Sequence, residues 1–125
     1  MFRMPDPVVY GGYLAGPLGH CFECHTPMEQ GRSDFENRAY AGGLHLPLGP
    51  DMILITANIT QDKETGIGAW TDAEIVTALT KGVRPDGGKL HPIMPYGFYA
   101  NMNMADIEAL VAFLRTVKPV ANAVK

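Results

Sequence analysis

The sequence lacks the features that mark membrane-spanning and nucleic-acid-binding proteins. Its longest apolar run, residues 109–114, is six residues long, whereas a membrane-spanning helix needs about 18 or more. Only 18% of the residues are charged and the net charge is −3, which leaves no basic face for a nucleic acid. Residues 1–7 also lack the apolar centre of a secretory signal. We therefore expect neither a nucleic-acid partner nor membrane insertion by this chain.

The composition of the chain is that of one loop-rich domain. A chain of 125 residues fits a single compact domain with a core of modest size, and we expect residues 1–125 to form it. Glycine (14) and proline (10) are frequent, but hydrophobic residues make up 46% of the chain. That share is too high for a disordered chain. The sequence therefore predicts short helices joined by long loops.

One motif carries the chemistry. Residues 21–25 read Cys-Phe-Glu-Cys-His, and Cys-x-x-Cys-His is the attachment signature of a c-type haem. On a helical turn, positions i, i+3 and i+4 share one face. Cys21, Cys24 and His25 can therefore meet one flat ligand together. The thiols would form thioethers with the haem vinyl groups and the imidazole would bind the iron. We predict one haem c, attached through Cys21 and Cys24, which also completes the small apolar core.

The cysteine pair has three alternative uses. A dithiol redox site expects a thioredoxin-like βαβ pattern, which is not visible here. A structural zinc site needs four ligands, usually in two pairs, but the chain has two cysteines and no zinc-like spacing among its other histidines, His20, His45 and His91. A disulfide between Cys21 and Cys24 would close a very short loop and stabilise little. Haem attachment explains the motif best.

The two iron ligands are predicted to be His25 and Met94. The free ring nitrogen of His25 should donate to a backbone carbonyl, which the sequence does not identify. Met94 lies 69 residues later (94 − 25) between Pro92 and Pro95, and these prolines restrict the backbone of its loop. A thioether on such a loop suits a soft sixth ligand. The alternatives are a core-filling role for Met94 and His91, Met102 or Met104 as the distal ligand.

Two further residues are candidates for the haem propionates. The indole N–H of Trp70 needs an acceptor if it is buried, and a propionate or a backbone carbonyl would serve. The guanidinium of Arg84 matches a carboxylate, although a plain surface arginine is the alternative. His45, on a loop, is expected to be a surface or structural residue.

Local patterns predict the main elements. A helix is expected over residues 7–16, stopped by Pro17, with Gly11 or Gly12 allowing another helix to approach. Residues 52–55 are short and apolar, as in a strand, and the polar residues 28–38 are expected to be a solvated segment. Thr71 to Glu74 forms a capping box for a helix that ends at Gly82. A last helix, capped by Asn103, should run to about residue 117 and cross the first helix.

Residues 19–27 (GHCFECHTP), 58–70 (NITQDKETGIGAW) and 90–96 (LHPIMPY) resemble the haem domains of cytochrome c subunits of membrane-bound alcohol, aldehyde and gluconate dehydrogenases. The likeness runs from about residue 12 to residue 120. It implies an all-α cytochrome c fold, with three to four short helices wrapped around one covalently bound haem c. The family often has proline at the position of Gln61 and an aromatic residue at that of His91. Its subunits commonly join three such domains and a membrane anchor, whereas we expect one domain and no anchor here.

These ligands predict a redox role. With His25 and Met94 on both axial positions, the iron has no open site, so we expect a one-electron carrier and not an enzyme. It would move electrons between a periplasmic or membrane-bound dehydrogenase and a downstream respiratory acceptor, such as an oxidase or another cytochrome. We expect a bacterial periplasmic monomer or subunit whose targeting segment is absent. The alternatives are a haem enzyme or gas sensor with a displaceable distal ligand, and a thiol-disulfide protein without haem.

Overall fold

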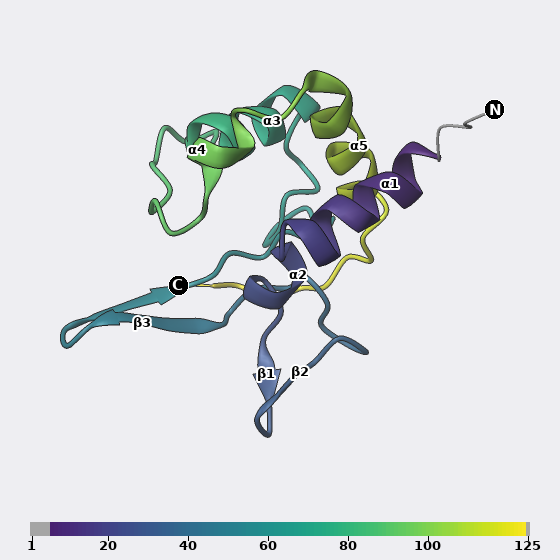
Figure 1. Ribbon diagram of the computed structural model, residues 1–125. Helices are drawn as coiled ribbons and strands as arrows, with labels where there is room; N and C mark the ends of the chain where they lie inside the picture. The colour runs from purple at the N-terminus through teal and green to yellow at the C-terminus, as the bar shows by residue number, and fades with distance from the viewer. Residues whose placement is uncertain (1–5, 125) are drawn as a thin grey trace.

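The computed structural model describes residues 6–124, which form five α-helices, one π-helical turn and two antiparallel hairpins (Figure 1). The helical elements are α1 (Pro7–Tyr13), η1 (Leu14–Leu18), α2 (Cys21–Cys24), α3 (Asp72–Lys81), α4 (Tyr96–Tyr99) and α5 (Met104–Leu114). The hairpins pair β1 (Met28–Glu29) with β2 (Arg32–Ser33), and β3 (His45–Gly49) with β4 (Met52–Ile55). The helices outnumber the three to four that were expected, and the hairpins add short strands to a mainly helical fold.

The crossing of α1 and α5 is the centre of the fold, and Figure 1 shows the two helices side by side at the upper right. Gly11 makes this approach possible, because a Cβ there would overlap the carbonyl of Ala109. A Cβ on Gly12 would come within 3.2 Å of the Phe113 ring. The predicted crossing near Gly11 and Gly12, with Phe113 beside it, is therefore confirmed.

The first helix does not stop at Pro17. The helix widens instead into the π-helical turn η1, which contains Pro17 and ends at Leu18. The Gly19 N–H donates to the Leu14 carbonyl at 2.6 Å, a bond over five residues. Proline clashes with the carbonyl four residues earlier in a regular α-helix, and the wider turn accommodates it. The prediction that Pro17 ends the helix is wrong for this reason.

The caps of the later helices follow the sequence signals. The Thr71 hydroxyl accepts from the Glu74 N–H and the Glu74 carboxylate accepts from the Thr71 N–H, which completes the capping box of α3. This helix ends at Gly82 in the left-handed conformation, with φ +67°. Asn103 caps α5 by accepting from the Asp106 N–H. The helix α5 ends at Leu114, about three residues before the predicted end.

The core lies where α1, α3 and α5 meet the loops. Its buried apolar residues include Leu14, Ile67, Ile75, Leu79, Ile107, Leu110, Val111 and Leu114. The predicted strand at residues 52–55 is confirmed as β4, in which Ile55 pairs with His45. Residues 28–38 are mostly exposed, as expected, and include the first hairpin. None of the helices that the structure describes has the length and apolar character of a membrane-spanning segment.

Candidate haem site

The helix α2 brings the three motif residues together. Cys21 opens this single turn and is 8% exposed, Cys24 closes it and is exposed, and His25 follows as the C-terminal cap. The His25 N–H donates to the Cys21 carbonyl at 2.9 Å, which continues the helical spacing. No disulfide joins Cys21 to Cys24. Among the described residues there is no cluster of three or more His, Cys, Asp or Glu side chains suited to a metal ion.

His20 sets the entry into this turn. Its backbone lies in the left-handed region, with φ +55°, which costs free energy for a residue that carries a side chain. Its carbonyl accepts from the N–H groups of Glu23 and Cys24, and its ring lies 3.2 Å from the Glu23 carboxylate. No sequence signal marks this conformation. His20 is therefore a structural cap of the motif turn.

His25 is oriented through one ring nitrogen. Its Nδ1 lies 2.7 Å from the carbonyl of Ala57, so that Nδ1 is the donor and Nε2 is free for a metal. Burial lowers the pKa of His25, and the bond to Ala57 opposes this shift. The lowered pKa favours the neutral imidazole, which is the form that binds metals. The predicted bond to a backbone carbonyl is thus present, and the acceptor is Ala57.

Gly42 packs directly on this acceptor. It adopts φ +73°, and a Cβ at this position would overlap the carbonyl of Ala57. Its own N–H donates to the His25 carbonyl at 2.6 Å. Glycine is the residue that tolerates both the positive φ and the close approach. The Gly42 backbone therefore touches both the histidine and the peptide that orients it.

Met94 lies on the loop before α4. Its N–H donates to the His91 carbonyl at 3.0 Å, and its carbonyl accepts from the Tyr96 N–H at 2.7 Å. Its side chain is half-buried and packs against the core. The Nδ1 atom of His91 accepts from the Ile93 N–H at 3.1 Å, so this histidine stabilises the same loop. Met94 as the distal ligand stays a prediction.

The other methionines differ in their placement. Met102 packs against the core from the segment before α5, whereas Met104 is 57% exposed. His45 is exposed on β3, as expected for a surface residue.

Tyr99 connects the Met94 loop to the cysteine turn. Its hydroxyl donates to the Gly19 carbonyl at 3.0 Å, across 80 residues of chain. It also lies beside the Cys21 thiol, and burial is the main reason that the pKa of Cys21 is raised to about 11. Sequence reasoning did not identify Tyr99, because the partner of its hydroxyl is a carbonyl that no side chain marks.

Trp70 and Arg84 are the two residues predicted to contact the haem propionates. Trp70 is half-buried against the core and its carbonyl accepts from Arg115 at 2.6 Å. No hydrogen bond of the described residues involves its indole N–H, so the alternative of an indole bonded to a backbone carbonyl is not seen. Arg84 is 45% exposed, and its Nε lies 3.4 Å from the Asp86 carboxylate. Both propionate contacts stay predictions.

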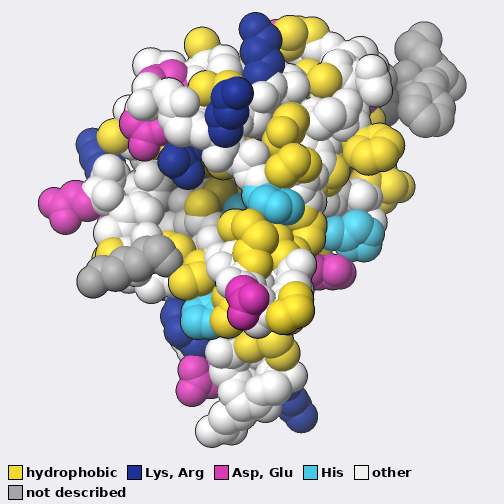
Figure 2. All heavy atoms as spheres, turned by 90° about the vertical axis from the view of Figure 1, so that its left-hand side faces the viewer, with side chains coloured by type: hydrophobic (Ala, Val, Ile, Leu, Met, Phe, Trp, Pro, Cys, Tyr) yellow, Lys and Arg dark blue, Asp and Glu magenta, His cyan; other side chains and the backbone are white. Residues whose placement is uncertain are grey.

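These residues fit a haem c. Figure 2 shows a hollow on the face that lies at the left of Figure 1, with hydrophobic side chains at its floor and a histidine at its edge. Large apolar side chains are exposed next to the motif and next to Met94 in the chain, namely Leu18, Ile93 and Phe98. Two thiols, one oriented imidazole and one thioether are the groups that attach and ligate a haem c. An apolar cofactor would cover surface that is otherwise costly to expose.

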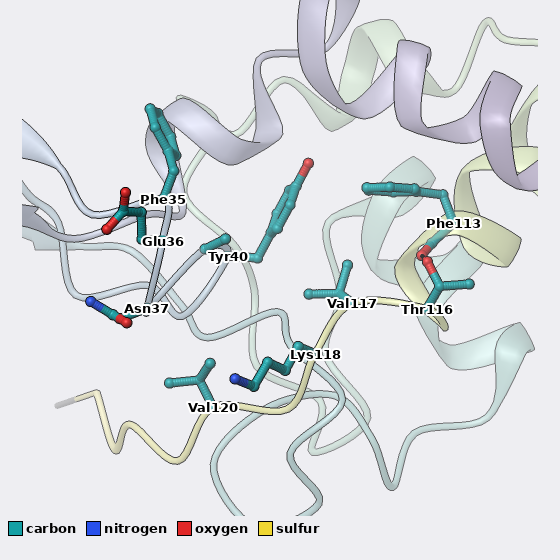
Figure 3. A pocket seen from close by; sticks show the side chains of 10 residues that line it. Phe35, Glu36, Asn37, Tyr40, Phe113, Thr116, Val117, Lys118 and Val120 are labelled. Atoms are coloured by element: carbon teal, nitrogen blue, oxygen red, sulfur yellow. Dashed lines mark hydrogen bonds between the residues drawn. The ribbon is translucent and has the colours of Figure 1, made fainter.

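A separate hollow of about 230 Å³ lies around Tyr40 and contains none of these groups. In Figure 3 the Tyr40 ring stands between Phe35 and Phe113, and its hydroxyl points away from Val120. The Tyr40 and Phe113 rings meet edge to face at 5.7 Å, and burial raises the pKa of Tyr40 to about 12. This hollow is a gap beside an aromatic cluster and is not the haem site.

Comparisons with known proteins agree with the motif. The family model of cytochrome c matches residues 18–118. The chain is 41% identical to the cytochrome c subunit of a quinone alcohol dehydrogenase from Gluconacetobacter polyoxogenes, over 90% of this chain and 22% of that protein. It is 37% identical to the cytochrome c subunit of a gluconate 2-dehydrogenase from Pantoea cypripedii, over 96% of this chain and 26% of that protein.

A third relative is a nicotinate dehydrogenase subunit from Pseudomonas putida, which is 40% identical over 87% of this chain and 8% of that protein. The chain therefore spans about a quarter or less of the length of the relatives described. The expected resemblance to cytochrome c subunits of dehydrogenases is confirmed.

Proposed function

Because the chain belongs to the cytochrome c family, we propose that it is a one-electron carrier with one haem c attached through Cys21 and Cys24. The observation that carries this proposal is the turn α2, where two cysteines and an imidazole whose Nδ1 is hydrogen-bonded to the Ala57 carbonyl lie within five residues. A haem bound there would supply an iron that takes up and gives back one electron.

The candidate haem-binding side chains have different proposed roles. Cys21 and Cys24 would hold the haem, and His25 through Nε2 and Met94 through its thioether would ligate its iron. An iron held by both side chains would have no open position for oxygen or a substrate. The domain is then an electron-transfer component and carries no catalytic residue. Trp70 and Arg84 are the proposed donors to the propionates.

The relatives indicate which proteins would exchange the electron. Those named above are subunits of alcohol, gluconate and nicotinate dehydrogenases. We propose that this domain receives electrons from such a dehydrogenase and passes them to a respiratory acceptor, an oxidase or another cytochrome. A periplasmic location fits the proposed covalent haem attachment.

One observation favours a second function. The loop before Met94 is exposed at Pro92 and Ile93, and the hydrogen bonds of Met94 itself are local. A ligand on such a loop could be displaced, as a haem enzyme or gas sensor would require. Carbon monoxide separates the two functions, because rapid and complete binding to the ferrous protein would favour the second.

The first experiment tests haem attachment. The chain is produced in a periplasm that is competent for haem attachment, and its mass is measured by mass spectrometry. We expect the mass of the chain plus one haem, lost when Cys21 and Cys24 are both replaced by serine. An unmodified mass would end the haem proposal.

The second experiment tests the distal ligand with Met94→Ala. We expect this variant to bind carbon monoxide rapidly and to have a lower reduction potential, because a thioether ligand favours the ferrous state. The matched control is Met104→Ala, since the Met104 side chain is 57% exposed and should affect neither readout. Unchanged spectra in Met94→Ala would remove Met94 as the ligand.

A further inference from the structure

A cluster of hydrogen-bonded polar groups adjoins the peptide that orients His25. We define the Asn58 cluster as Asn58, Thr60, Thr65, Val120 and Asn122. The Asn58 amide donates to the Thr65 hydroxyl (3.1 Å), the Val120 carbonyl (2.8 Å) and the Asn122 carbonyl (3.3 Å). The Asn58 side-chain oxygen accepts from both the N–H (2.9 Å) and the hydroxyl (2.7 Å) of Thr60. The amide of Asn58 is thereby fixed from two sides.

Asn58 and Thr60, the two central side chains of this cluster, are unusually buried for polar groups. Asn58 is 4% exposed and Thr60 is fully buried. Buried polar groups cost free energy unless they are hydrogen-bonded, and among the described residues no buried side-chain N or O atom lacks a partner. The cluster joins segments 60 or more residues apart, because the Val120 N–H also donates to the Thr60 hydroxyl at 3.1 Å. Such a cluster fixes the backbone on which it is built.

That backbone includes the acceptor of His25. The carbonyl of Ala57 and the N–H of Asn58 belong to one planar peptide unit, so an anchored Asn58 fixes the direction of the Ala57 carbonyl. Thr56, on the other side, is held by its bonds with Gly43 and Leu44. The same C-terminal segment also contacts the loop before Gly42, since the Asn122 amide donates to the carbonyl of Ala41 at 3.0 Å.

Asn122 is placed close to Gly42 as well. Its amide lies 3.4 Å from the Gly42 carbonyl, and Gly42 packs on the Ala57 peptide. The C-terminal segment therefore supports the acceptor peptide twice, through Asn58 and through residues 41 and 42.

We propose that Asn58 is a positioning residue for His25, and that the Asn58 cluster sets the reduction potential by fixing the hydrogen bond from His25 Nδ1 to Ala57. This inference rests on the proposed function. A strong bond at Nδ1 makes the imidazole a better electron donor to a bound metal. Stronger donation stabilises the oxidised metal and lowers the potential.

The sign of the potential change distinguishes this role from a merely structural one. If the cluster sets the bond, its removal weakens the bond, reduces electron donation by His25 and raises the potential. If the cluster only keeps the fold closed, its removal admits water to the site. Greater exposure to water favours the more highly charged oxidised state and lowers the potential.

The test replaces the hydroxyl of Thr60. Thr60→Val removes the bonds that the hydroxyl makes with Asn58 and Val120 at nearly constant shape and leaves the backbone bond from Thr60 to Asn58, whereas Thr60→Ser keeps the hydroxyl. Asn58→Ala is the more drastic variant. The matched control is Gln61→Ala, which removes the bond from Gln61 to the Leu114 carbonyl (3.0 Å) and the bond from Arg115 (3.1 Å). The control weakens the same loop without touching the Ala57 peptide.

Two readouts are measured on the haem-loaded protein: the reduction potential, and the proton resonance of His25 Nδ1–H in the reduced state. We expect Thr60→Val to raise the potential and to move the resonance upfield, Thr60→Ser to restore both, and Gln61→Ala to change neither. A lower or unchanged potential in Thr60→Val, or a resonance that stays in place, would overturn the inference. The proposed function would survive that result, provided the unaltered protein carries haem.

Discussion

The two sides of the proposed haem site are held by different kinds of structure. On the His25 side, the Ala57 carbonyl lies between Thr56 and Asn58, which are both buried and bonded to distant segments. On the Met94 side, the hydrogen bonds at Met94 are local turns, and the bond that crosses the site is the one from Tyr99 to Gly19. The histidine is therefore fixed by the whole fold, and the methionine mainly by its own loop.

This difference predicts where the site opens first. Local opening requires least free energy where few buried contacts and few long-range bonds are lost. The loop at Met94 meets this description and the segments around Ala57 do not. If an external ligand reaches the iron, we expect it to replace Met94 while His25 stays in place.

We expect the largest loss of stability on the His25 side, from Gly42→Ala. The left-handed φ alone costs roughly 1–3 kcal/mol for a residue with a side chain, and the new Cβ would also overlap the Ala57 carbonyl. The measurement is the free energy of unfolding in denaturant, together with the fraction of protein that retains His25 ligation.

Gly87→Ala is the matched control for this prediction. Gly87 has φ +86°, but a Cβ there meets nothing within 4 Å. It should therefore lose stability through backbone strain alone and should keep the spectrum of the unaltered protein. Equal losses in the two variants would show that the contact between Gly42 and Ala57 does not matter.

We expect a smaller loss of stability on the Met94 side, from Tyr99→Phe. The variant loses the bond to Gly19, which is worth about 1 kcal/mol. If this bond closes the loop over the iron, the population with Met94 displaced should rise about fivefold, which is the factor that corresponds to that free energy. The measurement is the rate at which the ferrous protein binds carbon monoxide.

Tyr96→Phe removes a hydroxyl from the same helix α4 without breaking the bond to Gly19, and it should bind carbon monoxide at the original rate. A Tyr99→Phe variant that binds no faster would mean that the Met94 loop is held by its own turns. The two sides of the site would then be more alike than the hydrogen bonds indicate.

The parts of the site that the sequence predicted are those set by neighbouring residues. The face shared by Cys21, Cys24 and His25 follows from helical spacing, and the cap of α3 at Thr71 follows from a four-residue signal. The end of the first helix was missed because the effect of Pro17 depends on whether the helix can widen into a π-turn.

The parts that could not be predicted depend on backbone groups far away in the chain. The sequence predicted that a carbonyl would orient His25, but every residue has a carbonyl, and Ala57 has no side-chain signal. Gln61 was noted as a departure from the usual proline of the family. The structure shows its use, because its amide donates to the Leu114 carbonyl at the end of α5, a partner 53 residues away.

We expect the smallest effects on stability in acid, from one carboxylate on the His25 side, Asp62, and one on the Met94 side, Asp86. Bonds from the Thr65 hydroxyl and then the Thr65 N–H lower the pKa of Asp62. A bond from the Gly88 N–H, followed by Arg84, lowers the pKa of Asp86. A lowered pKa means that the carboxylate form stabilises the fold. Each contribution is present above the unfolded pKa, near 3.8, and is lost as the pH falls through the folded pKa.

The two carboxylates stabilise different parts of the fold, and this difference predicts which substitution lowers stability more. Asp62 fixes Thr65, which also bonds to Asn58 and Asn122, whereas Asp86 closes an exposed turn in the loop before Met94. We expect Asp62→Asn to lower stability at neutral pH and to flatten its fall in acid. Asp86→Asn should do the same to a smaller extent. The measurement is the free energy of unfolding of both variants from neutral pH to below 3.8. A larger effect in Asp86→Asn would contradict this prediction, because the Met94 side would then be the more firmly anchored one.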